Sequence, residues 1–390
     1  MDAVIIITLC ALLLLAYLFD LSSHRTKIPS VILLLVLGWL VKYFSLALHL
    51  EIPRMERLLP ILGSVGLILI VLEGALELEL NRSKLGTVSK SVIMALVPLM
   101  LLSFLIALLF SHFGGYPLRD CLLNAIPLSV ISSSIAISSG RHLSAPDREF
   151  VVYESSLSDI FGVLFFNYVM LNETVNASSV ADFSLKLLLI ILISFVGSLL
   201  LAYLLKRIDH HIKFAPIILL TIVIYEISKI YHLPSLVFIL LFGLFLGNLD
   251  ELKKFSWIRK FDPDTLNNEV AKFKEITGEA TFLIRALFFL LFGYLIDTHK
   301  ILNSNTFTWA LVISFSIFII RGIALKLSGT PLNPLLFIAP RGLITILLYF
   351  AIDPVHQIPF VNRSLVLQVI IITALIMMVG MIADKKVKPV

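Results

Sequence analysis

Two acids and several serines share one apolar segment of the chain, which reads Tyr153-Glu154-Ser155-Ser156-Leu157-Ser158-Asp159. Asp159 falls near the middle of a stretch long enough to span a bilayer, where a carboxylate costs about 2.5–3.5 kcal/mol. Ser155 and Asp159 are four residues apart and share one face of a helix. A hydroxyl and a carboxylate on one face suit a hard monovalent cation, because such cations prefer oxygen ligands. The chemistry indicated is reversible binding of a cation, or of a proton, inside a membrane.

Further oxygen ligands are expected from a serine-rich run at 131–140. Its composition suits an interrupted helix, whose freed carbonyls in the stretch Ser132–Ser134 can complete an oxygen shell at Asp159. Ser132 and Ser133 are therefore counted among the expected ion-binding residues. Ser158 is expected to assist. Desolvation and a nearby arginine act on the protonation of Asp159 in opposite directions. Proton and cation can therefore compete for one carboxylate, and this competition gives exchange if the unoccupied site cannot cross the membrane.

Three arginines, Arg285, Arg321 and Arg341, lie inside other apolar segments. With a rise of 1.5 Å per residue, Glu154 and Arg321 lie at similar depths, roughly 8 and 9 Å from the inner face. Their opposite charges predict a structural ion pair. Arg285 and Arg341 lie at roughly 13 Å, close to the 15 Å of Asp159. We expect both to organise the site and Asp159 to remain the exchangeable group.

The composition is that of a polytopic membrane protein. The 390 residues are 59% hydrophobic and 15% charged, with a mean hydropathy of +1.00, whereas soluble domains are nearer half apolar and a quarter charged. Spans of about 20 apolar residues recur along the whole chain and predict an all-α protein with about 13 transmembrane helices in a single integral-membrane domain, 1–390. They cover roughly 3–20, 29–46, 58–79, 88–111, 119–139, 149–170, 183–205, 213–230, 234–249, 276–297, 305–327, 332–351 and 363–384.

Basic residues set the expected orientation. Most of the 31 Lys and Arg residues fall in alternate loops, which the positive-inside rule places on the cytoplasmic side of a cell (inner) membrane. The N-terminus is then outside and the C-terminus cytoplasmic. The N-terminal segment has no basic region and no small-residue cleavage site, so we expect a retained first helix.

Glu73, roughly 8 Å from the inner side, is expected to line an inner funnel.

Two spans have compositions typical of broken helices. The fifth carries the serine run, and the twelfth contains Pro334 and Ala339-Pro340-Arg341-Gly342. They are six to seven spans apart, which predicts two inverted repeats whose broken helices cross. The polar stretch 250–275 between the two halves contains aromatic residues among its charges and is expected to form an amphipathic inner linker.

Other classes of protein lack their signatures. No G-x-x-x-x-G-K-[ST] sequence is present, so no nucleotide partner and no primary pump are expected. The two cysteines, Cys10 and Cys121, lie in different segments, and the histidines fall in loops or at segment ends, so we expect neither a cofactor nor a bound metal beyond the transported ion. The pI of 9.1 reflects positive inner loops rather than nucleic-acid binding. An enzyme is not expected, and a cation channel is the rival class.

At these residues the chain resembles the monovalent cation:proton antiporter superfamily. Glu154-Ser155-Ser156-Leu157-Ser158-Asp159 is similar to the family motif Glu-Ser-x-x-Asn-Asp, with Ser158 in place of Asn. The resemblance extends over about residues 5–384. It includes the segments Ser132-Ser133-Ser134-Ile135-Ala136, Thr281 to Phe289 with Arg285, Ile320-Arg321-Gly322 and Pro340-Arg341-Gly342-Leu343.

The resemblance implies an antiporter that exchanges Na⁺, with Li⁺ possible, for H⁺ by alternating access at Asp159. One acid beside the Glu154–Arg321 pair implies electroneutral exchange. The serine-rich broken helix is closer to potassium-efflux relatives, so exchange of K⁺ for H⁺ is the alternative. The resemblance also implies a homodimer in the lipid bilayer. Its scaffold would include about 1–46 and 183–249, and its mobile core about 58–170 and 276–384.

Overall fold

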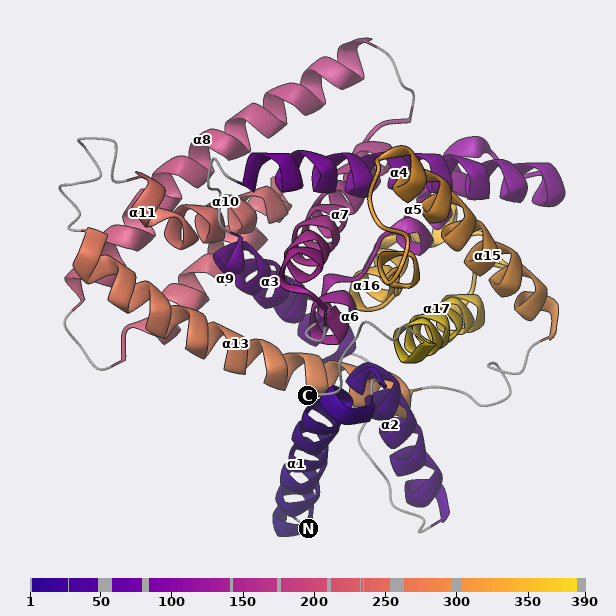
Figure 1. Ribbon diagram of the computed structural model, residues 1–390, viewed down its shortest axis with the longest axis horizontal. Coiled ribbons are helices and arrows are strands. Elements are labelled where there is room, and N and C mark those ends of the chain that lie inside the picture. Colours follow the sequence, from indigo (N-terminus) through magenta and orange to yellow (C-terminus); the bar gives the residue numbers. More distant parts are fainter. Residues whose placement is uncertain are drawn as a thin grey trace.

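The computed structural model describes residues 2–26, 28–47, 58–78, 84–140, 143–173, 177–208, 212–231, 233, 235–252, 263–295 and 304–383. These residues form helices joined by short connections, with no strand among them (Figure 1). In chain order the first half contains α1 (Asp2–Thr26), α2 (Ser30–Ala47), α3 (Leu58–Glu77), α4 (Leu85–Gly114), α5 (Leu118–Ser129), α6 (Ser133–Ser139) and α7 (Ala145–Leu171).

The second half begins with four helices that follow the acid-bearing α7. They are α8 (Ala177–Arg207), α9 (Phe214–Ile230), α10 (Leu236–Gly247) and the short α11 (Leu249–Leu252). The remaining elements are α13 (Pro263–Tyr294), α15 (Ser304–Leu327), the 3₁₀ turn η4 (Leu335–Phe337), α16 (Leu343–Ala351), the 3₁₀ turn η5 (Pro354–His356) and α17 (Arg363–Ala383).

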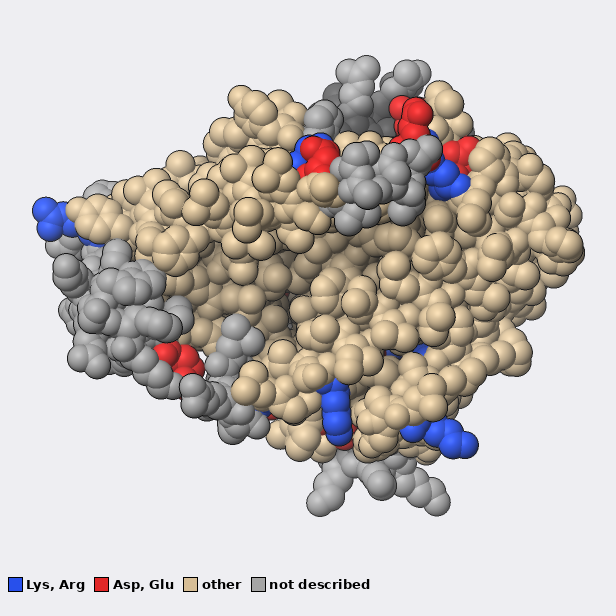
Figure 2. Space-filling view, turned by 90° about the horizontal axis from the view of Figure 1, so that it is seen from above, with Lys and Arg blue, Asp and Glu red and all other residues tan. Residues whose placement is uncertain are grey.

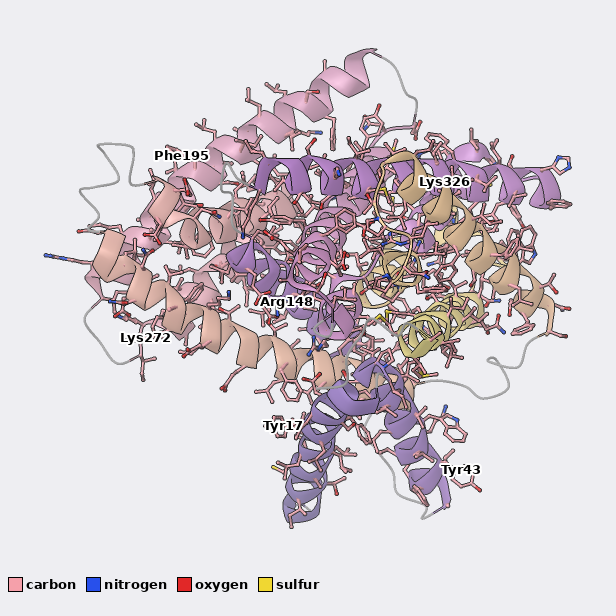
Figure 3. The ribbon with its side chains drawn as sticks, viewed as in Figure 1. Tyr17, Tyr43, Arg148, Phe195, Lys272 and Lys326 are labelled. Carbon is pink, nitrogen blue, oxygen red and sulfur yellow. The ribbon has the colours of Figure 1, made fainter. Side chains whose placement is uncertain are left out.

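The described helices are built to cross a membrane. Eight candidate spans are long and apolar enough to do so in the part of the chain that the structure describes, with α5 and α6 counted as one span. Tyr17, Tyr43 and Phe195 project from α1, α2 and α8 at the periphery and are about half exposed (Figure 3). On the face shown in Figure 2, charged side chains gather mostly near the upper and lower margins, with a broad uncharged band between them. The chain is a multi-pass membrane protein.

The number of crossings in the thirteen-span prediction stays a prediction. The apolar parts of α1 and α10 are short helices of Ile7–Ser22 and Leu236–Gly247. The acid-bearing α7 is 27 residues long but is not among the eight, because its polar side chains lower its hydropathy. A criterion based on length and hydropathy therefore misses α7, the helix that carries Asp159.

The two interrupted spans are present and cross each other, as the sequence predicts. The backbone leaves the helix between α5 and α6, where Val130 and Ser132 are extended. It does so again between η4 and α16, at residues 338–342. At the crossing the Ser132 amide donates to the Pro340 carbonyl at 2.9 Å. Gly342 permits this approach, since a β-carbon there would lie 2.7 Å from Ser132 Oγ.

The helices pack in two groups that meet at α7 and α3 (Figure 1). In one group α4 packs against α5, α7 and α15, and α15 packs against α17. In the other, α13 packs against α2 and α3, and α10 packs against α3 and α8. The broken spans belong to the first group and contact the second mainly through α3, which touches α6 and α16.

The stretch 250–275, predicted to be an inner linker, is described in part, and its role as a linker stays a prediction. Residues 263–275 are the first turns of α13, which continues unbroken into the membrane span, and residues 253–262 lie outside the described residues. The helix is continuous because of an apolar stripe at helical spacing: Leu266, Val270 and Phe273 are all buried. Their spacing of three and four residues buries one face of a continuous helix.

A buried asparagine in the middle of α5 anchors this helix and so helps to set the position of the broken span. The Asn124 side chain donates to the carbonyls of Asp120 and His356, both at 2.8 Å, and accepts from the Ile358 amide at 3.3 Å. It is 0% exposed. One side chain therefore fixes α5 to the segment that precedes α17.

We expect Asn124→Ala to destabilise the protein by about 2–3 kcal/mol, because it leaves buried backbone groups without partners. The apparent melting temperature in detergent measures this. Asn172→Ala is the matched control, since Asn172 makes one local bond to Tyr168 O, and it should change stability by no more than about 0.5 kcal/mol. Equal melting temperatures for the two variants would contradict the anchoring role.

Candidate ion-binding site

Asp159 lies on α7 against the interruption of the fifth span. Its side chain is 2% exposed. The hydroxyl of Ser133, the first residue of α6, donates to Asp159 Oδ2, and the Ser133 backbone amide also faces this carboxylate. The other oxygen, Oδ1, is buried and accepts no hydrogen bond from any described residue. Within the described residues, one oxygen of the carboxylate is therefore held by a hydrogen bond and the other is not.

Two nearby serines of α7, Ser155 and Ser158, make different kinds of hydrogen bond. Ser155 donates to the Val151 carbonyl at 2.7 Å, which leaves its lone pairs to act as acceptors. Ser158 accepts from the Ile131 amide at 3.0 Å and so satisfies a donor that the broken helix releases. Ser158, which stands where the family motif has Asn, thus holds the interruption against α7.

The serines of the interruption divide in the same way. Ser133 is the one that the structure brings to Asp159 by a hydrogen bond. Ser132 instead bonds Ser134, with 3.0 Å between their hydroxyl oxygens, and its amide makes the crossing with Pro340. The roles of Ser132 and Ser133 as cation ligands stay predictions.

Glu154 and Arg321 are brought together in the core. Arg321 donates Nη1 and Nη2 to the two carboxylate oxygens of Glu154 at 2.7 and 2.8 Å. Its Nε donates to the Leu335 carbonyl of η4 at 2.8 Å. Both side chains are at least 97% buried. This paired, bidentate geometry is the condition under which two charges can stay buried, and it links α7, α15 and the twelfth span.

Arg341 is a clamp between the two broken spans. Its guanidinium donates to the carbonyls of Leu128 and Ser129, at the end of α5, and of Ala339, at distances of 2.8–3.1 Å. The last carbonyls of a helix have no partner within the helix, and inside a membrane no bulk water replaces one. Helix rise places Arg341 and Asp159 at similar depths in the membrane, but the Arg341 guanidinium hydrogen-bonds backbone carbonyls and not the Asp159 carboxylate.

Arg285 and Glu73 lie where the second group of helices faces the site. Arg285 donates to the Ser134 carbonyl at 3.4 Å and lies 3.7 Å from Asp20 of α1. It therefore reaches the broken helix but is not brought to Asp159. Glu73 is partly buried and faces α13, since its Oε1 is 3.5 Å from where a β-carbon of Gly278 would lie.

Two supporting residues were not identified from the sequence. Asp20 accepts from Ser30 at 3.1 Å and faces Arg285. Its position at the end of the first apolar run was the available signal, but a carboxylate there is equally typical of an interfacial residue. Thr373 of α17 accepts from the Arg341 amide at 3.1 Å, and nothing in its sequence neighbourhood marks it.

A buried carboxylate with one free oxygen, hydroxyls and freed backbone at two crossed interruptions define a membrane carrier for a small cation. The family model for "Sodium/hydrogen exchanger, transmembrane" matches residues 10–384. The chain therefore belongs to the sodium/hydrogen exchanger family, whose members are transporters and not enzymes.

Solved structures with a similar fold are known. The chain is similar to two structures of the sodium proton antiporter MjNhaP1 from Methanocaldococcus jannaschii, both with a TM-score of 0.68. Identity is 18% in the first, over 97% of this chain and 96% of that one, and 17% in the second, over 97% and 94%. No curated protein sequence matches the chain. At this identity the structural likeness shows the fold alone.

Breaking the buried pair should be far more damaging than breaking an exposed one. Glu154→Gln leaves Arg321 charged and buried, which we expect to cost about 3–5 kcal/mol. Adding Arg321→Met should recover most of this loss, because no unpaired charge then remains. The apparent melting temperature in detergent measures both changes. The control is Asp182→Asn, which breaks an exposed pair with Lys186 and should cost no more than about 0.5 kcal/mol.

Proposed function

We propose that this protein exchanges Na⁺ for H⁺ at the carboxylate of Asp159. The observation that carries the proposal is the state of its two oxygens: Oδ2 is held by Ser133 and Oδ1 is buried without a partner. A buried carboxylate is stable when it is protonated or when it binds a cation. Oδ1 is the atom on which the two ligands compete.

The surroundings support a carrier whose site holds one ligand at a time. No described Lys or Arg pairs with Asp159. Arg321 is engaged with Glu154 and Arg341 with backbone carbonyls. Arg285 contacts the Ser134 carbonyl and Asp20. Without a resident counter-charge, the ionised carboxylate requires an incoming cation. A cation that departs must then be replaced by a proton before the site becomes neutral enough to cross the membrane.

The cation is proposed to be sodium, with lithium as a second substrate. The family is that of sodium/hydrogen exchangers, and the similar protein MjNhaP1 is a sodium proton antiporter, which supports this choice. The alternative, potassium, is favoured by the three consecutive serines at the interruption. All of the proposed ligands are oxygens, and they suit a hard monovalent cation of either size.

Alternating access is proposed to arise from movement between the two groups of helices in a homodimer. The packing supports a boundary at the contact of α7 with α3. The broken spans with α4, α15 and α17 would form the mobile core, and α2, α8 and α10 would belong to the scaffold. On this division α3 and α13, placed in the core from sequence, form the scaffold wall that the core faces. The proposed location is the cell (inner) membrane, with the N-terminus outside.

Asp159→Asn should abolish the exchange. In proteoliposomes with an imposed pH gradient and a trapped pH dye, adding Na⁺ to wild type should restore the dye signal, and the variant should show none of this recovery. Asparagine keeps the size of the side chain and one accepting oxygen, but it carries no negative charge and cannot bind and release a proton. Comparing Na⁺, Li⁺ and K⁺ ranks the substrates. Asp182→Asn, an exposed acid of α8, is the control. Recovery that persists in Asp159→Asn would place the site elsewhere.

Exchange is expected to be electroneutral, because one carboxylate trades one Na⁺ for one H⁺ while Glu154 stays paired with Arg321. The rate should therefore not change when a membrane potential of either sign is imposed with potassium and valinomycin. Moving one net charge per cycle would be worth about 2.3 kcal/mol per 100 mV. A rate that follows the imposed potential would contradict one-for-one exchange and would indicate a second titrating acid.

A further inference from the structure

Ser156 carries a buried hydroxyl that no described residue satisfies. Its side chain is 6% exposed, and its Oγ has no hydrogen-bond partner. The serines on either side are satisfied, Ser155 by the Val151 carbonyl and Ser158 by the Ile131 amide. An unpaired buried oxygen is destabilising and calls for an explanation in terms of a ligand or a function.

Ser156 shares a helix face with Asp159, the residue that carries the other unpaired oxygen. The two residues are three apart on α7, so their β-carbons lie about 5–6 Å from each other. Hard cations of sodium's size hold oxygens at about 2.4 Å. One cation can therefore contact Ser156 Oγ and Asp159 Oδ1 together, and that contact would satisfy both orphaned atoms.

The residue of α3 that lies against the Ser156 side chain is a glycine, Gly74. A β-carbon at Gly74 would lie 3.0 Å from Ser156 Oγ, so the hydroxyl occupies space that the missing side chain leaves. Glu73, the acid expected in the inner funnel, is the next residue on α3. Ser156 thus lies at the contact of α7 with α3, one turn of α7 from Asp159 and beside the helix that carries Glu73.

Other unpaired serine hydroxyls show that this feature alone is no site. Those of Ser103, Ser198 and Ser314 are also buried without partners, but they lie on α4, α8 and α15 and not on the helix of Asp159. Ser156 differs because Asp159, three residues further along the same helix, carries a second unpaired oxygen, and because its hydroxyl packs against Gly74 of α3, where no side chain lies between the two helices.

We propose that Ser156 Oγ is a cation ligand, sharing the transported ion with Asp159 Oδ1 and meeting it first on the side of Glu73. The inference rests on the proposed exchange at Asp159, but it adds a ligand that competition at the carboxylate does not require. The rival explanation is that Ser156 is merely small enough to let α7 pack against α3.

Ser156→Ala separates the two explanations, because it removes the oxygen and leaves the packing volume almost unchanged. Equilibrium binding of radioactive sodium to the purified protein should show a Kd raised about threefold to tenfold, the loss of one polar contact. The KM for Na⁺ in proteoliposomes should rise by the same factor, with the rate at saturating Na⁺ nearly unchanged. Ser156→Cys, which keeps the size and replaces the oxygen with a poor ligand for sodium, should lose affinity equally. Ser103→Ala is the matched control and should behave like wild type.

Gly74→Ala tests the geometry. Its new carbon should displace the Ser156 hydroxyl and raise the Kd, and it should add nothing in the Ser156→Ala background, because the two changes remove one contact. A wild-type Kd in Ser156→Ala would overturn the inference and leave the proposed exchange intact if wild type still exchanges and Asp159→Asn does not. A wild type that binds no sodium would overturn both.

Discussion

Backbone groups released by the two helix interruptions must all be satisfied where the lipid offers no partner, and the rest of the site depends on how this is done. The carbonyls at the end of α5 accept hydrogen bonds from the Arg341 guanidinium. The Ile131 amide is taken by Ser158 and the Ser132 amide by the carbonyl of Pro340. The freed backbone groups of each interruption are thus hydrogen-bonded by residues of the other interruption or of α7. The crossing is a single unit, and it cannot loosen at one point without exposing polar backbone elsewhere.

This closure explains why the charged residues near the site are not interchangeable. Arg341 has a planar fork of donors, which lets one side chain serve three carbonyls in a way that an ammonium group cannot. Arg321 uses the same property to bind both oxygens of Glu154 and a carbonyl of η4. Because both guanidiniums are fully used, neither neutralises Asp159. Asp159 is therefore a buried acid that no described arginine neutralises, which is the property on which the proposed exchange depends.

The boundary between the two groups of helices passes beside this acid. On one side Ser133 and the broken span hold Asp159, and on the other α3 presents Gly74 and Glu73. Arg285 reaches across the same boundary, from α13 to the Ser134 carbonyl and toward Asp20 of α1. On the proposed mechanism, in which one group of helices moves against the other, this contact of Arg285 with the broken helix would have to be remade in each cycle.

The sequence by itself determined the class of protein and the identity of its principal charged residues. Composition required a membrane protein, the rise of a helix gave Glu154 and Arg321 equal depth, and proline, glycine and serine marked the two interruptions. Depth, however, gives the position of a side chain only along the membrane normal. Which serine turns toward Asp159, that Arg341 serves carbonyls and that Arg285 faces Asp20 depend on rotation about each helix axis and on contacts between segments far apart in the chain. Those were decided only when the helices packed, because the partners of a buried polar group are chosen by three-dimensional proximity and not by spacing along the sequence.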